Sequence, residues 1–286
     1  MLAAPVVPLE KHVEKAFRRV LAAVGEPWRL ARTGRPPLRR PKEYALALFC
    51  RSFWGWTFRE AGCVLKIPKT CLHWASKRLQ AAWVKALIQR TAERLRSLYT
   101  AKCAILDSTG VSLHGAGFKR RFERRKHFKL HGFVEYSPWA HRIWFAAVKV
   151  TSSRVHDVRA GRRMLGEAPP SELYGDKAFD AKSLYKLAYE LGWIICMQQR
   201  KTAASRRGIR GKVWRSYDDA KRKKYRGRVE AAFGGFANRY GSRINEKLTS
   251  TRRRACEMWA LAHNIRTLAK SALNYLWDAL SVEQAF

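Results

Sequence analysis

The order of strand-like and helix-like segments after residue 100 constrains the fold of this chain more than any other feature. Three strand patterns come first. Residues 102–111 form a near-continuous apolar run, residues 126–137 alternate apolar and polar side chains, and residues 141–153 are apolar and rich in β-branched residues. Short spacers such as "YSPWAHR" indicate that these segments form an antiparallel meander.

The segments that follow alternate between helix and strand. Residues 154–165 have helical spacing, and residues 171–179 form a short strand that leads into a loop. Residues 180–192 form a helix, and residues 193–199 form a buried strand. We therefore predict an α/β fold in which a mixed sheet is flanked by helices.

The last third of the chain combines a basic segment with two further helices. Residues 200–222 carry much charge and no apolar periodicity, so we expect a mobile basic loop or excursion there. A helix is predicted next because its apolar side chains share one stripe, and a final helix is predicted at about residues 253–280. The stripe consists of Val229, Ala232, Phe233, Phe236 and Tyr240.

Residues 1–98 are predicted to be all-helical, with a helix-turn-helix at about residues 57–82. Thr57 and Glu60 form a capping box at the start of the first helix, and Pro68 marks the turn into the second. The predicted inner face of the second helix contains Leu72, Ala75, Leu79 and Ala82, and its outward side chains are Thr70, His73, Lys77 and, at the margin, Arg78.

The charge of the chain favours one of two interpretations of these helices. They could form an ordinary helical hairpin with a solvated face, or place the second helix in the DNA major groove. The sequence holds 58 Lys and Arg against 22 Asp and Glu, a formal net charge of +36, which implies a polyanionic partner. Neutralising phosphates releases counterions, so double-stranded DNA is the expected partner.

A membrane surface is the weaker alternative, because no stretch approaches about eighteen apolar residues. The N-terminal segment lacks the features of a signal peptide, so we expect a cytosolic protein without a membrane partner. The six cysteines show no paired spacing and are expected to be buried free thiols. His127 and His131 lie in an alternating strand pattern, which argues against a helical zinc pair.

Three acids are predicted to meet at one edge of the sheet. Asp107 is expected to end the first strand, and Asp176 to end the fourth strand, its neighbour in the sheet. Glu230 lies beside the apolar stripe of a later helix and is expected to point back along the sheet and away from solvent. Converging carboxylates repel one another unless a cation neutralises them, and hard oxygen ligands suit Mg²⁺ or Mn²⁺. Two such ions about 4 Å apart would support in-line displacement at phosphorus.

Each acid also has a purely structural interpretation. Asp-Ser-Thr is a good turn sequence, and Asp176 could pair with Lys177 in a loop. Glu230 could pair with Arg226 one helical turn earlier, which is worth about 0.3–0.5 kcal/mol on a surface. The combination of the three acids favours a catalytic site.

The segments that carry these acids, "ILDSTGV", "YGDKAFD" and "RGRVEAAFGGFANRYG", resemble in this order the three signature regions of the DDE transposases of bacterial and archaeal insertion sequences. The similarity covers about residues 100–270. It implies that residues 99–286 form a ribonuclease-H-like catalytic domain, preceded by a helix-turn-helix that binds DNA. Such a protein would be cytoplasmic and nucleoid-associated in a prokaryote.

The resemblance also implies roles for individual residues. Asp107, Asp176 and Glu230 would bind two divalent ions, which would serve to nick the transposon end and join its 3′ hydroxyl to target DNA. Arg226, which matches an Arg of one branch of the family, and Arg239 are candidates for holding phosphates or a flipped base. Lys129 and Lys177 are further candidates for phosphate contacts. The outward face of the second helix would bind the terminal inverted repeats, and we expect a homodimer on DNA.

Three other functions fit the same sequence features. A junction-resolving nuclease with the same core would cut branched DNA without joining a 3′ end to a target. A DNA-binding regulator with an inactive core would show no metal-dependent cleavage. A basic RNA-binding structural protein would have no preference for a DNA end.

Overall fold

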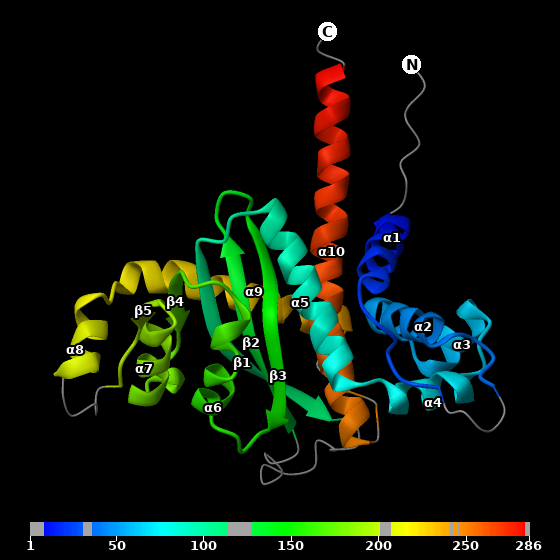
Figure 1. Cartoon of the computed structure of the whole chain (residues 1–286), viewed down its shortest axis with the longest axis horizontal. Helices are drawn as coiled ribbons and strands as arrows, with labels where there is room; N and C mark the ends of the chain where they lie inside the picture. The colour runs from blue at the N-terminus through cyan, green and yellow to red at the C-terminus, as the bar shows by residue number, and fades with distance from the viewer. Residues whose placement is uncertain are drawn as a thin grey trace.

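The molecule consists of a group of N-terminal helices, a mixed sheet flanked by helices, and a long C-terminal helix (Figure 1). It is seen here as a computed structural model, which describes residues 9–30, 36–113, 127–200, 207–240, 243–244, 246 and 248–283. Side chains are described for all of these except residues 9–10, 113, 236–237, 239–240, 243 and 273–283.

The sheet confirms the predicted α/β class and strand order. Its strands follow one another as β3-β2-β1-β4-β5, and a short β6 pairs with the end of β1. The first three strands form the predicted antiparallel meander, whereas β4 and β5 run parallel to β1. The strands are β1 (Cys103–Leu113), β2 (His127–Ser137), β3 (Arg142–Ser152), β4 (Glu172–Gly175), β5 (Ile194–Met197) and β6 (Arg243–Ile244).

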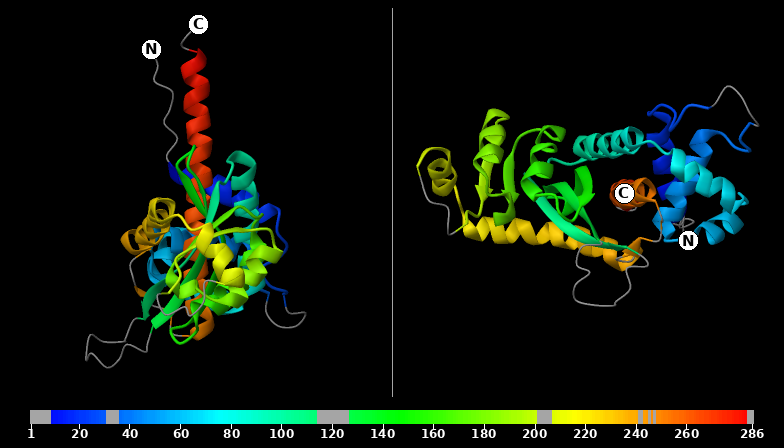
Figure 2. Two further views of the ribbon diagram at one scale, coloured as in Figure 1. Left: turned by 90° about the vertical axis from the view of Figure 1, so that its left-hand side faces the viewer. Right: turned by 90° about the horizontal axis from the view of Figure 1, so that it is seen from below.

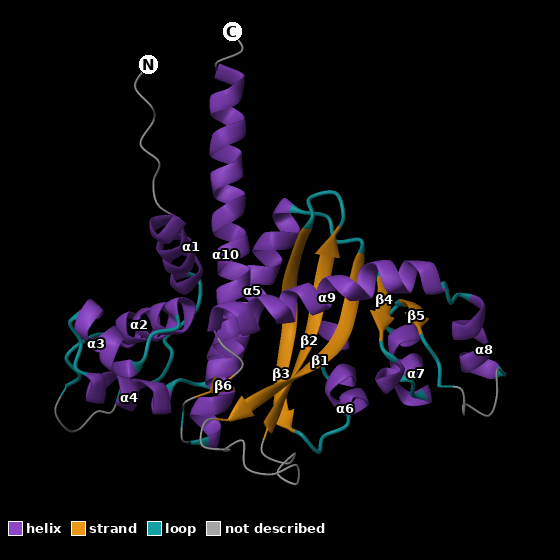
Figure 3. Ribbon diagram, turned by 180° about the vertical axis from the view of Figure 1, so that it is seen from behind, coloured by secondary structure: helices purple, strands orange, loops and turns teal. Residues whose placement is uncertain are grey.

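Helices cover both faces of this sheet. One face carries α6 and α7, and α9 crosses the other face, as Figure 3 shows from behind. α5 and the first half of α10 pack beside β3. These helices are α5 (Ala81–Leu98), α6 (Asp157–Arg162), α7 (Lys182–Glu190), α8 (Gly208–Arg215), α9 (Asp219–Tyr240) and α10 (Thr249–Glu283), with short 3₁₀ turns at Leu165–Glu167 and Lys177–Phe179.

The alternation of side chains along β1 divides the core in two. Ala104 and Leu106 belong to a cluster with α6, α7 and β5. Cys103 and Ile105 point to the opposite face and belong to a larger cluster with α5, α9 and α10. This larger cluster continues into the N-terminal helices, because α10 packs on α1 and α2 as well as on β3.

The N-terminal helices follow the sequence pattern closely. They are α1 (Leu9–Ala22), α2 (Pro41–Trp54), α3 (Phe58–Leu65) and α4 (Lys69–Arg78). The capping box is formed, since Thr57 Oγ1 accepts from the Glu60 backbone N–H at 3.2 Å and Glu60 accepts from the Thr57 N–H at 2.7 Å. The turn between α3 and α4 requires Gly62, because a Cβ there would lie 2.9 Å from the Ile67 carbonyl oxygen.

The predicted inner face of the second helix is confirmed for three of its four residues. Leu72, Ala75 and Leu79 are buried, whereas Ala82 is exposed. The reason is that α4 ends at Arg78 and a new helix, α5, begins at Ala81, so Ala82 no longer shares the helical phase of α4.

The basic segment predicted as a loop or excursion at residues 200–222 is partly helical, which corrects the loop interpretation there. Residues 208–215 form α8, whose Val213 is fully buried, and α9 begins at Asp219. The side chain of Asp218 accepts a hydrogen bond from the Lys221 backbone N–H at 3.0 Å, which caps the start of α9. Residues 201–206 of the predicted loop lie outside the described part of the chain.

Two further expectations concern cysteines and membranes. All six cysteines are free thiols, but only Cys103, Cys196 and Cys256 are buried, and Cys63 is exposed on α3. In the portion of the chain that the structure describes, no helix is both long enough and apolar enough to span a bilayer.

Candidate active site

Asp107 and Asp176 lie side by side because of the register between two parallel strands. The pairing of β1 with β4 ends at Leu106 and Gly175, so each acid directly follows the last paired residue of its strand. Our prediction that β1 ends at Asp107 is wrong. The strand continues to Leu113, because its other edge stays paired with β2 as far as Ser112. The end of β4, and not the end of β1, therefore exposes the Asp107 edge.

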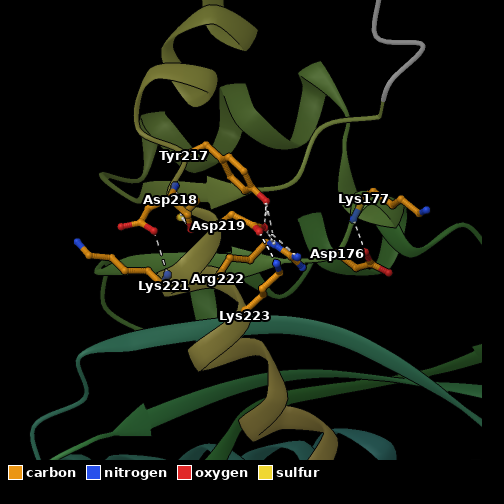
Figure 4. A network of polar contacts seen from close by, with 9 residues as sticks. Asp176, Lys177, Tyr217, Asp218, Asp219, Lys221, Arg222 and Lys223 are labelled. Atoms are coloured by element: carbon orange, nitrogen blue, oxygen red, sulfur yellow. Dashed lines mark hydrogen bonds and ion pairs between the residues drawn. The ribbon is translucent and has the colours of Figure 1, made fainter.

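Each of the two acids is fixed by a local backbone hydrogen bond. Asp107 Oδ1 accepts from the Ser108 N–H at 2.8 Å, and Asp176 Oδ1 accepts from the Lys177 N–H at 2.7 Å. The second bond begins the short 3₁₀ turn after β4. Figure 4 shows the side chain of Lys177 directed away from Asp176, so these two residues do not form the loop ion pair that was one interpretation of the sequence.

The third acid reaches this edge from α9, together with an arginine. Arg226 and Glu230 are one helical turn apart, and Arg226 Nη2 lies 3.6 Å from Glu230 Oε1. The same nitrogen lies 3.7 Å from Asp176 Oδ2. Two carboxylates from remote parts of the chain thus face one guanidinium. Glu230 itself is 63% exposed, so the expectation that it points away from solvent is wrong.

A glycine opposite Asp107 allows α9 to approach the sheet. Gly132 of β2 is the register partner of Asp107, and a Cβ there would lie 2.8 Å from Cζ of Phe233 and 2.9 Å from Cε1 of Phe145. Phe233 is buried one turn after Glu230 on α9. The absence of a side chain at Gly132 therefore lets Phe233 pack against β2, which holds Glu230 near Asp107.

The pKa of Asp107 depends on its burial and on the charges of Arg226, Asp176 and Glu230. Burial raises the pKa of its carboxyl to about 6, the Ser108 hydrogen bond and the charge of Arg226 lower it, and the charges of Asp176 and Glu230 raise it further. At neutral pH the Asp107 carboxyl is therefore ionised, and its negative charge adds to a site in which Arg226 is the counter-charge.

The donor set of this cluster fits a hard divalent cation, since carboxylate oxygens are the ligands that Mg²⁺ and Mn²⁺ prefer. Over the described ranges, however, no three Asp, Glu, His or Cys side chains are close enough together to form a metal cluster. The guanidinium of Arg226 lies between Asp176 and Glu230 and supplies the positive charge there. The donor chemistry fits, and the carboxylates would have to draw closer around an ion.

Lys129 lies on the other face of the sheet from Asp107. Its Nζ is 3.1 Å from Asp157 Oδ2, at the start of α6, and His131 Nδ1 lies 3.1 Å from Asp157 Oδ1. Burial raises the pKa of Asp157, but hydrogen bonds from His131, Ser108 and Lys129 outweigh it and hold that pKa well below its usual range. Sequence reasoning missed this network, because it depends on the register that places Lys129 and His131 beside α6.

A second acid of the "GDKAFD" segment has a structural role that sequence reasoning also missed. Asp180 is buried and accepts hydrogen bonds from Tyr185 Oη at 2.9 Å and from the Arg200 N–H at 2.9 Å. It also pairs with Arg210 Nη1 at 2.9 Å, which ties α8 to the loop after β4. The signal was the second Asp of the segment, four residues after Asp176.

The start of α9 holds a further polar cluster close to the site. Asp219 accepts from Tyr217 Oη at 2.5 Å and pairs with Arg222 Nη2 at 3.1 Å and Lys223 Nζ at 2.8 Å. Figure 4 shows these side chains directed toward Asp219. Hydrogen bonds from Lys223, Tyr217 and Arg222 hold the pKa of Asp219 well below its usual range. The cluster fixes the first turns of α9, and hence the position of Arg226.

The remaining predicted DNA-contact residues lie away from the acids or outside the described side chains. Arg239 belongs to the helical backbone of α9, but its side chain lies outside the described part. On α4, the Arg78 guanidinium stacks over the ring of Trp74 at 4.1 Å, and the ring of His73 meets the edge of Phe58. The α4 residues predicted to contact DNA, Thr70, His73, Lys77 and Arg78, are all exposed.

Comparison with known proteins gives one positive result. Residues 99–265 match the family model of the transposase DDE domain, a range that contains all three acids and Arg226. No curated protein matches the chain at a significant level.

Proposed function

This chain belongs to the family of transposases with a DDE domain, whose model covers more than half of its length, and we propose that it binds the terminal inverted repeats of an insertion sequence and catalyses DNA cleavage and strand transfer. The observation that supports this proposal is that Asp176 and Glu230 both face Arg226, with Asp107 beside Asp176 where the pairing of β1 with β4 ends.

In this mechanism Asp107, Asp176 and Glu230 would hold two divalent ions, Mg²⁺ or Mn²⁺. When bound, such ions would supply an activated water and positive charge beside the phosphorus. Asp107 is ionised above a pH of about 6, so at neutral pH it can act as a ligand without first losing a proton. No covalent bond between protein and DNA is required.

The basic residues of the chain bind and orient the DNA. Arg226 can donate to a phosphate oxygen beside the acids, because its guanidinium already lies between Asp176 and Glu230. Lys177 is exposed on the loop next to Asp176 and can contact the backbone. The exposed face of α4 binds the inverted repeat. Since an element has two ends, we include a homodimer on DNA in the proposal, at the nucleoid of a prokaryotic cytoplasm.

The test is metal-dependent cleavage of DNA that carries the element's own ends. We expect Asp107→Asn, Asp176→Asn and Glu230→Gln each to lower cleavage by roughly a thousandfold or more while end binding survives. Glu190→Gln, an exposed acid on α7, is the matched control and should cleave normally. Normal cleavage by any of the three variants would show that the residue concerned is not catalytic.

A strand-transfer assay separates this function from its alternatives. Joining of a cleaved 3′ end to a target duplex is expected of a transposase, whereas a junction-resolving nuclease would only cut. Lys77→Ala or Arg78→Ala should weaken end binding and leave the chemistry intact. Unchanged binding in both variants would assign α4 a packing role only.

A further inference from the structure

A basic cleft lies between the edge strand β3, helix α6 and the first turns of α10. Its volume is about 510 Å³, and Ala81 at the start of α5 also lines it. Five of the side chains that line it are Lys or Arg, and one is an acid. The charged lining residues are Lys149, Arg159, Arg163, Arg253, Arg254 and Glu257.

The positive charges of this cleft are largely unneutralised. The acid, Glu257, already pairs with Arg254 one helical turn away. Within the part of the chain that the structure describes, no carboxylate lies within ion-pair distance of Lys149, Arg163 or Arg253, all of which are exposed. The fold therefore holds several cations next to one another without an internal counter-charge, an arrangement that an external anion would stabilise.

The titration of the lining residues agrees with this description. Partial desolvation of the exposed Lys149 ammonium by the packed atoms around it lowers its pKa, and the charges of Arg163, Lys85, Arg253 and Arg254 lower it further. Burial and Arg253 likewise lower the pKa of Arg254. Both groups are thus destabilised in their charged forms, and bound phosphate would reverse that effect.

The extent of the basic surface indicates a polymer and not a single anion. A neighbouring hollow of about 510 Å³ shares Arg159 and Arg163 with the cleft and adds Arg162 and His156. Several phosphates at regular spacing, as in a nucleic-acid backbone, match such an extended row of cations better than one small ligand.

The position of the cleft indicates duplex DNA as the polymer. Ala81 is three residues beyond the end of α4, and α10 packs against α4. α4, α6 and the first turns of α10 all lie toward the lower side of the molecule in Figure 1, which Figure 2 shows from below. We propose that this cleft is a second contact surface for the phosphate backbone of duplex DNA, adjoining the surface of α4. The inference rests on the proposed function only in assuming that α4 contacts duplex DNA.

The salt dependence of binding tests this proposal. Arg163→Gln with Arg253→Gln removes one cation from each side of the cleft, and Arg90→Gln with Arg94→Gln on α5 is the control with the same change of charge. Each lost phosphate contact lowers the slope of log K against log salt by roughly 0.9. For a duplex of about 30 base pairs, we expect the slope of log K against log salt to be smaller by about 2 in the cleft variant, and its affinity at physiological salt to be roughly tenfold lower. The control variant should match the wild type in both quantities.

Three outcomes would overturn the proposal: a cleft variant with the wild-type slope, a control variant with the same loss, or an equal loss of affinity for duplex RNA or anionic vesicles. Lys149→Gln, a single change at an exposed position of β3, gives a second measurement should the double variant fold poorly. Cleavage is scored separately. A protein that never cleaves but shows the slope change would refute the proposed function and support the cleft, whereas normal cleavage with an unchanged slope would refute the cleft alone.

Discussion

Arg226 Nη2 lies 3.7 Å from Asp176 Oδ2, although α9 and the loop after β4 are separated in the chain by a helix, a strand and a further helix. The same nitrogen also contacts Glu230. The guanidinium therefore serves as the counter-charge for acids that the sheet and α9 bring together. A divalent ion and Arg226 would compete for the same carboxylate oxygens.

This competition predicts the behaviour of Arg226→Gln. Without divalent ions, the loss of the guanidinium should increase the repulsion among the acids and raise the pKa of Asp107 further. Because both ion pairs are partly exposed, the cost in stability at pH 8 should be about 1 kcal/mol or less. Added Mg²⁺ should then raise the melting temperature of the variant more than that of the wild type, as measured by thermal unfolding.

Arg226→Lys keeps the charge and serves as the control. Its response to Mg²⁺ should resemble that of the wild type. If Mg²⁺ shifts the melting temperatures of Arg226→Gln and wild type equally, then Arg226 does not act as the counter-charge of this site.

The raised pKa of Asp107 predicts a pH dependence for the metal-free protein. Its pKa is about 6 in the folded chain against an ordinary value of 3.8, so the folded state holds the proton more tightly. The stabilisation is fully present below the ordinary pKa and is lost as pH rises through about 6. Asp107→Asn should therefore be more stable than the wild type at pH 8, by on the order of 1–3 kcal/mol, and equally stable near pH 3.5.

Urea unfolding of both proteins across this pH range measures the difference. A constant difference in the free energy of unfolding would contradict the raised pKa. The same titration should lower the apparent affinity for Mg²⁺ below a pH of about 6, because protons and metal compete for the carboxylate.

The strands and the juxtaposition of Asp107 and Asp176 could be predicted because they depend on sequence patterns and on which strands are neighbours. Apolar runs, alternation and short spacers specify β1 to β5, and neighbouring parallel strands bring Asp107 and Asp176 together whichever helices cover the sheet. The capping box at Thr57 is equally local, since both of its partners lie within four residues.

The features that sequence reasoning missed depend on tertiary contacts. α8 carries few apolar residues, and its place depends on the burial of Val213 and the pairing of Arg210 with Asp180. The face on which Lys129 lies follows from the strand register and from Asp157. The exposure of Glu230 depends on how closely α9 approaches β2 at Gly132, which no helical periodicity records.

The close packing of α9 against β2 at Gly132 predicts the effect of Gly132→Ala. The new methyl group would lie 2.8 Å from Phe233 and 2.9 Å from Phe145, both packed against it, so α9 must shift away from β2. Overpacking of this kind costs about 1–3 kcal/mol. Because Glu230 moves with α9, cleavage should fall by more than the loss of folded protein explains, as measured by cleavage rate per folded molecule.

Gly110→Ala is the matched control on the neighbouring strand. A Cβ there would meet only Cδ2 of His127 at 3.6 Å, which is ordinary van der Waals contact. Phe233→Leu should partly rescue Gly132→Ala by making room for the methyl group. Normal cleavage by Gly132→Ala would mean that the close packing at this point does not position Glu230.

A buried ion pair joins the N-terminal helices to the segment before α10. Arg51 Nη1 of α2 lies 2.7 Å from Glu246 Oε1, just before α10, and the side chains are only 13% and 7% exposed. The Arg51 guanidinium also stacks over the ring of Phe58 at 3.9 Å. Glu246→Gln should leave the arginine charge buried without its counter-charge, at a cost of about 3–5 kcal/mol in the free energy of unfolding.

The double variant Arg51→Met with Glu246→Gln removes both charges and should recover much of this loss, since a buried pair contributes little net stability once its desolvation is counted. Chemical denaturation of the two single variants, the double variant and the wild type gives the coupling between the residues. A coupling near zero would show that the pair is solvated in solution. A strong coupling, with end binding reduced in Glu246→Gln, would show that Arg51 and Glu246 hold α3 and α4 in place relative to the catalytic sheet.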